Sequence, residues 1–136
     1  MNNWKSARAI LAGILAAIIL TTLVDWALHA AGVYPPLQEP INDALALLAT
    51  SYRVVIGVGA AWLVARLAPQ NPMKHAMTAG AIGMAVAIAG VITTWNANLG
   101  PRWYAIALAV LALPQSWVGA KLYESRAHAK MAIQQE

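Results

Sequence analysis

The sequence predicts an all-α integral membrane protein, a bundle of four helices that cross a bilayer in up-down-up-down order. Composition is the first reason: 60% of the 136 residues are hydrophobic and 10% are charged, whereas a soluble domain carries about 25% charged residues. The second reason is a set of four apolar stretches, each close to the roughly 20 residues that span the hydrocarbon core. Residues that break helices separate these stretches. We therefore expect one transmembrane domain over residues 1–136.

The expected spans are, in order, residues 7–31, 44–68, 75–95 and 103–123. The first stops at Gly32 and the following prolines, and the second starts after Asn42, a good N-cap residue, and ends before Pro69. The fourth contains Pro114, which a membrane helix tolerates when neighbouring groups bond to the freed carbonyl. The run from Glu124 onward is expected either to extend the fourth span or to fray.

Lysine and arginine give the expected orientation, because they accumulate in cytoplasmic loops. One set flanks the two chain ends and the connection between the second and third spans: Lys5, Arg8, Arg66, Lys74, Lys121, Arg126 and Lys130. Only Arg102 lies in a connection on the other side. We therefore expect both termini in the cytoplasm (N-in and C-in), with residues 124–136 as a cytoplasmic tail.

Small residues recur along the third span at intervals of three and four, which places them on one face of the helix. The stripe consists of Gly80, Gly83, Ala87 and Gly90, with Ala76 and Thr94 at its ends. Helices in lipid associate through close packing of small residues. The stripe is therefore either an internal seam of the bundle or the contact between two copies of the chain, and both interpretations remain open.

Ionisable residues inside a span are costly and are candidates for function. Asp25 and His29 share a face of the first span, with Thr22 one turn earlier, and Tyr52 and Arg53 lie in the second span. From the 1.5 Å rise per residue, Asp25 lies roughly 9 Å and Arg53 roughly 14 Å below the same membrane surface. Because arginine has a long side chain that can reach outward, we expect Asp25 and Arg53 to meet.

Two interpretations of this polar cluster remain open. In the first, Asp25 and Arg53 form a latch that sets the register of two helices, with His29 and Tyr52 completing its hydrogen bonds. In the second, Asp25, His29 and Arg53 form an outward-facing site of a minimal proton- or ion-coupled transporter or channel that works as a dimer. A paired arginine keeps the carboxylate ionised, which favours the latch.

Several classes of function have no support in the sequence. The chain lacks the GxSxG, HExxH and phosphate-loop motifs, so we expect no enzyme. It has no cysteine and three scattered histidines, so we expect no metal site and no cofactor. Its basic residues flank apolar spans, which argues against a nucleic-acid partner. The expected partners are the lipid bilayer and either a second copy or another membrane protein, with the chain acting as an accessory subunit or homo-oligomer.

Four short motifs carry a resemblance to a known group of proteins. They are Tyr52-Arg53, the run Ala65-Arg66-Leu67-Ala68-Pro69, Pro72-Met73 with His75-Ala76, and Leu99-Gly100-Pro101 with Trp103-Tyr104. In these motifs the chain resembles a group of small uncharacterised four-helix membrane proteins of bacteria. The resemblance covers most of the chain and implies a location in the bacterial inner membrane. It implies no activity, because the group has none established.

Overall fold

The computed structural model describes residues 3–135, and over this range the chain forms four α-helices and no strand. They are α1 (Asn3–Ala30), α2 (Asp43–Leu67), α3 (Pro72–Thr94) and α4 (Arg102–Gln134). Each of the four is long and apolar enough to cross a membrane. The predicted all-α class and the four candidate spans are confirmed.

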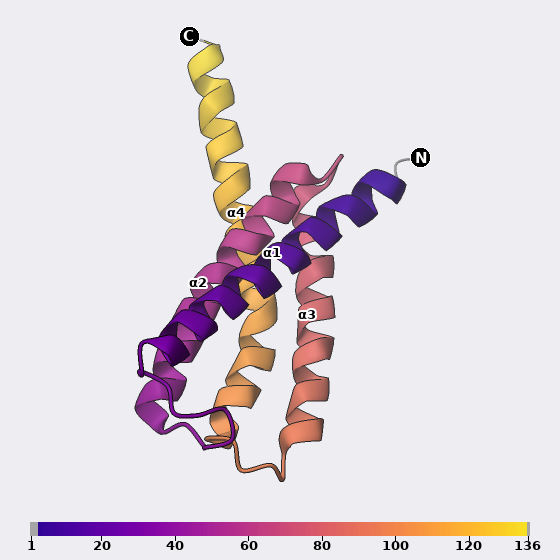
Figure 1. Ribbon diagram of the computed structural model, residues 1–136. Helices are drawn as coiled ribbons and strands as arrows, with labels where there is room; N and C mark the ends of the chain where they lie inside the picture. Colours follow the sequence, from indigo (N-terminus) through magenta and orange to yellow (C-terminus); the bar gives the residue numbers. More distant parts are fainter. Residues whose placement is uncertain (1–2, 136) are drawn as a thin grey trace.

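The chain reverses direction after each helix, as Figure 1 shows. The described chain begins and ends at one end of the molecule, and the short connection between α2 and α3 lies at that end too. We call this the terminal end. The connections between α1 and α2 and between α3 and α4 lie at the opposite end, which we call the loop end.

The boundaries of α2 follow from residues at its two ends. At its start, the side-chain oxygen of Asn42 accepts a hydrogen bond from the backbone N–H of Leu45 at 2.9 Å, which satisfies a donor that the first turn leaves unpaired. At its end, Ala68 is extended, with φ −63° and ψ 134°. A residue before proline disfavours the helical region, so Pro69 ends α2 one residue earlier than expected.

The helices α1 and α3 start earlier than the apolar stretches that predict them. Helix α3 begins at Pro72, three residues before the expected start, with proline in its first turn, where no intrahelical N–H bond is lost. Helix α1 begins by Asn3, four residues before the expected start. Helical hydrogen bonding continues through the polar residues that flank a span, whereas hydropathy marks only the part that lipid can cover.

Helix α4 differs most from the expectation, because it runs on to Gln134 instead of ending near Tyr123. Of the two outcomes expected for the residues after Glu124, the structure has the helical extension. This stretch consists largely of good helix formers, namely alanine, lysine, arginine, glutamine and methionine, and contains no glycine or proline. Its last turns project beyond the other helices at the terminal end (Figure 1).

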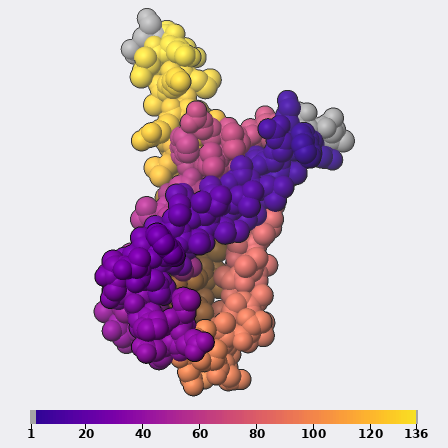
Figure 2. Space-filling view, viewed as in Figure 1, coloured from indigo at the N-terminus to yellow at the C-terminus, as the bar shows by residue number. Residues whose placement is uncertain are grey.

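The four helices do not pack as a square. Helix α2 is central and contacts each of the others, and α4 packs along both α2 and α3. Helix α1 lies obliquely across α2 and α3, as the indigo helix over the face shown in Figure 2, and over residues 3–135 it makes no backbone-level contact with α4. As a result α1 buries few residues, chiefly Ala9 and Gly13.

The core consists of small side chains, and large apolar side chains point outward. Apart from Tyr34, Val64 and Ser116, the side chains that the described chain buries are all alanine: Ala9, Ala46, Ala49, Ala61, Ala65, Ala76, Ala109, Ala112 and Ala120. Exposed leucine, isoleucine, valine and tryptophan cover the outside of all four helices. A soluble protein rarely exposes such a surface, whereas lipid accepts it.

Candidate functional site

The polar cluster forms where the last turns of α1 face the third turn of α2. The carboxylate of Asp25 on α1 lies 2.5 Å from Arg53 on α2, measured from Oδ2 to Nη2. Their side chains are 29% and 30% exposed, so neither side chain is fully buried inside the protein. A single charge in hydrocarbon is costly, and pairing makes the two residues neutral as a unit.

A chain of hydroxyl groups completes the bonding of this carboxylate. The Tyr52 hydroxyl donates to Oδ1 of Asp25, the oxygen that Arg53 does not contact. The Tyr34 hydroxyl lies 2.8 Å from that of Tyr52. Because a phenol has one hydrogen and Tyr52 gives it to the carboxylate, Tyr34 is the donor to Tyr52. Asp25 is therefore bonded from α2 by both a cation and a hydroxyl.

The end of α1 explains how Tyr34 reaches the cluster. Gly32 adopts a left-handed backbone conformation with φ 77°, which glycine takes without steric cost. The N–H of Gly32 bonds to the carbonyl of His29, and that of Val33 to Leu28, the paired bonds of a Schellman motif. The chain then folds back, and Tyr34 is only 8% exposed.

His29 joins the cluster through the main chain of Asp25 and not through the carboxylate of Asp25. Its Nδ1 donates to the main-chain carbonyl of Asp25 at 2.8 Å, because a carbonyl can only accept. Its ring lies 5.2 Å from the ring of Tyr34, centroid to centroid. Thr22 is exposed on α1 and makes no hydrogen bond through its side chain to any of residues 3–135. The expected cluster thus includes Asp25, Tyr52 and Arg53 directly and His29 indirectly, without Thr22.

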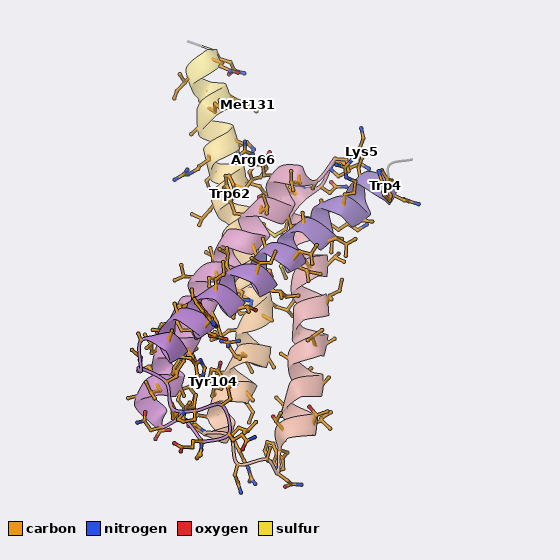
Figure 3. All side chains as sticks on the ribbon, viewed as in Figure 1. Trp4, Lys5, Trp62, Arg66, Tyr104 and Met131 are labelled. Carbon is orange, nitrogen blue, oxygen red and sulfur yellow. The ribbon has the colours of Figure 1, made fainter. Side chains whose placement is uncertain are left out.

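Two tyrosines of the site lie outside the polar cluster that the sequence predicts. Tyr34 caps the hydroxyl chain, and Tyr104 on the first turn of α4 places its ring 6.0 Å from the guanidinium carbon of Arg53. Figure 3 shows Tyr104 at the loop end, away from Lys5 and Arg66. Gly32 signalled a turn, but spacing along the chain does not reveal where the residue after that turn points.

A small cavity lies beside the cluster. It has a volume of about 130 Å³, and its lining includes Asp25, His29, Tyr34, Tyr52, Arg53 and Tyr104. The Nε of Arg53 is buried and has no hydrogen-bond partner among the described residues. Within residues 3–135 no group of histidine, aspartate and glutamate side chains is arranged to hold a metal ion. The arrangement can hold two helices together and can present a guanidinium N–H to a small acceptor.

The α3 stripe of small residues is divided by the fold. Gly80 is buried against Ser116 of α4, and a Cβ atom there would overlap that side chain. Gly83 is exposed, and Ala87 and Gly90 are half-buried. A Cβ atom built on Gly83 or Gly90 would meet nothing within 4 Å. Gly80 in the first half of the stripe therefore packs inside the bundle, whereas Gly83 and Gly90 border open space, and whether that space is an internal seam or a contact with a second copy stays open.

Comparison with known proteins assigns the chain to no family. The chain matches no model of a known protein family, no curated protein and no solved structure. What the sequence and the fold together identify is a four-helix protein whose helices are all candidate membrane spans.

Proposed function

We propose that the chain is a non-enzymatic integral membrane protein that works as a homodimer, joined through the second half of α3. The observation that carries the proposal is the open space at Gly83 and Gly90. Glycine costs about 1 kcal/mol relative to alanine in a helix interior. Membrane helices use it where another backbone comes close. A Cβ atom built at either position would meet no atom of residues 3–135 within 4 Å.

The shape and charge of this face favour a second copy as the occupant. Ala79, Gly83 and Ala87 follow the four-residue spacing of small residues that lets two membrane helices cross closely. No charged residue occurs between Lys74 and Arg102, so the face carries no charge that would select a partner of opposite sign. A two-fold axis brings such a face against itself.

A cavity next to Gly83 gives the proposal a second support. It has a volume of about 230 Å³, and residues of all four helices line it, including Ile14, Ala17, Ala60, Gly83 and Ala112. Unfilled space forfeits packing contacts in an apolar interior. A side chain such as Val86 of the second copy has the apolar character to fill it.

Purification in mild detergent, with the mass of the complex measured by light scattering, tests the proposal. The wild-type chain should elute with the mass of two chains. Gly83→Leu with Gly90→Leu should give the mass of one folded chain, because two leucines block the close approach. Ala85→Leu with Ala89→Leu is the matched control, since both alanines are exposed on the same helix.

Two results would contradict the homodimer. A wild-type monomer would remove the proposal altogether. A stoichiometric complex with a larger membrane protein, purified from native membranes, would make the chain an accessory subunit instead. Loss of the dimer in the control and not in the glycine variant would place the contact on a different face of α3.

In the proposed membrane topology, the terminal end faces the cytoplasm of a bacterial inner membrane. The support is the distribution of charge: Lys5 and Arg66 lie toward the terminal end in Figure 3, as the positive-inside rule requires of a cytoplasmic surface. The loop end then faces outward, with the polar cluster beneath it, and the Asp25–Arg53 pair acts as a latch between α1 and α2.

Proton- or ion-coupled transport is the second candidate function. The observation that favours it is the cavity beside Asp25, His29 and Arg53, together with the Arg53 Nε, which has no hydrogen-bond partner among residues 3–135. Reconstituted wild-type protein should then carry protons or cations into liposomes, and Asp25→Leu with Arg53→Leu should abolish the flux without unfolding the chain. Equal flux in the double variant would exclude this function.

A further inference from the structure

A second polar pocket lies at the terminal end, far from the Asp25–Arg53 cluster along α1. It has a volume of about 290 Å³ and is lined by Lys5, Arg8, Ala9, Ala12 and Leu67. It lies between the first turns of α1 and the last turn of α2. Two cations thus border a pocket whose other lining side chains are apolar and mostly small.

Neither cation is paired with another group in the part of the chain that the structure describes. Lys5 and Arg8 form no ion pair and no side-chain hydrogen bond within residues 3–135, where the salt bridges are Arg53–Asp25 and Lys121–Glu124. The first turn of α1 contains no acidic residue, so the positive end of its dipole adds to the same potential. Within residues 3–135, the pocket is therefore a site of uncompensated positive charge.

The geometry at this end holds the two cations on one side. Lys5 and Arg8 are three residues apart, so they share a face of α1. Between them, Ser6 is tied to α3 by a 2.8 Å hydrogen bond from its hydroxyl to Nε2 of His75. This bond anchors the start of α1 to a second helix.

The surroundings are those of the region where headgroups meet acyl chains. Trp4, next to Lys5 in Figure 3, is 74% exposed, and an exposed indole favours the headgroup level of a bilayer. Leu67 and the two alanines supply an apolar floor next to the charges. A ligand that fits has an anionic group for the cations and hydrocarbon for the floor.

We propose that this pocket binds the phosphodiester headgroup of an anionic phospholipid. Arg8 can bind two phosphate oxygens through its planar guanidinium, and Lys5 adds a mobile point charge. Basic pockets between membrane helices bind lipid headgroups in this manner. A free phosphate ion shares the anionic chemistry, but it leaves the apolar floor unused, so the lipid is the occupant.

The experiment uses the full-length chain, purified in detergent and depleted of lipid. Phosphatidylglycerol and phosphatidylcholine with identical acyl chains are added separately, and bound lipid is counted by native mass spectrometry. The wild-type chain should retain phosphatidylglycerol preferentially. Lys5→Gln with Arg8→Gln should weaken that retention about 30-fold, the fold-change that corresponds to roughly 1 kcal/mol for each of two basic residues.

Three controls separate the possible outcomes. Lys121→Gln with Lys130→Gln removes the same charge from α4, outside the pocket, and should bind like the wild-type chain. Arg8→Lys keeps the charge and should retain most of the preference. Inorganic phosphate at millimolar concentration should not displace the lipid.

Three results would overturn the proposal. Equal retention of both lipids by the wild-type chain would show that the pocket does not select an anion. Equal retention of phosphatidylglycerol by the wild-type chain and the Lys5/Arg8 variant would place the binding elsewhere. Displacement of the lipid by inorganic phosphate would assign the pocket to a free anion instead. If the double variant does not fold, the single changes Lys5→Gln and Arg8→Gln give the same comparison, each with a loss of about 5-fold.

Discussion

Asp25 and Arg53 are a pair whose members depend on each other. The carboxylate accepts from the guanidinium and from the Tyr52 hydroxyl, so removal of its charge leaves both donors without their acceptor. Truncation of one partner of an ion pair costs more than replacement of both by apolar residues, because the second charge is left unpaired. The latch interpretation predicts this asymmetry.

We predict that Asp25→Asn lowers the free energy of unfolding by about 2 kcal/mol, between the values typical of exposed and of buried pairs. Asp25→Leu with Arg53→Leu should recover most of the loss, because neither charge remains. Stability is measured by titration with a denaturing detergent, followed by circular dichroism. Glu39→Gln is the control, since Glu39 is exposed in the connection between α1 and α2 and forms no ion pair with residues 3–135. A double variant no more stable than Asp25→Asn would contradict the latch.

Between elements, the glycines fall into two groups that differ in what a side chain would meet. At Gly119 on α4, a Cβ atom would overlap the carbonyl oxygen of Val58 and the side chain of Ala61 on α2. At Gly59 on α2 it would meet nothing within 4 Å. The close contact of α2 with α4 therefore requires glycine at position 119. At position 59 a larger side chain would meet no neighbouring atom.

We predict that Gly119→Ala destabilises the bundle by about 1–3 kcal/mol, the usual cost of forcing extra atoms into a packed interface. Gly59→Ala is the matched control and should raise stability by up to about 1 kcal/mol, because alanine favours the helix and no contact opposes it. Thermal unfolding in detergent, followed by circular dichroism, measures both changes. Equal effects of the two substitutions would contradict the close approach of α2 and α4.

The molecule as a whole has an asymmetric distribution of charge between its two ends. Both ends of the described chain and the connection between α2 and α3 lie at the terminal end, and these segments carry most of the basic residues. Because the chain contains no cysteine, single introduced cysteines report the position of each segment without background.

We predict that cysteines at Gln38 and Asn96 react with a membrane-impermeant maleimide in intact spheroplasts. Cysteines at Gln70 and Ser125 should react only after permeabilisation, because positive charge retains their segments in the cytoplasm. All four positions are exposed, so burial does not limit the reaction. The reverse labelling pattern would place the terminal end outside the cytoplasm.

Sequence by itself determined the number, type and approximate limits of the helices. Hydropathy and helix breakers act locally, so Asn42 and Pro69 set the ends of α2 wherever that helix lies in the fold. The sequence also predicted that Asp25 and Arg53 lie at similar depths below one membrane surface, since the rise of a helix converts residue number into distance.

Only the tertiary structure decided which faces of the helices meet. The oblique course of α1 leaves Gly83 and Gly90 uncovered, and the turn at Gly32 carries Tyr34 to Tyr52. Spacing along one helix places residues on a common face, but it contains no information on the crossing angle that covers or uncovers that face. In a chain so rich in alanine, many faces are small enough to pack, and the choice among them depends on the fit of all four helices together.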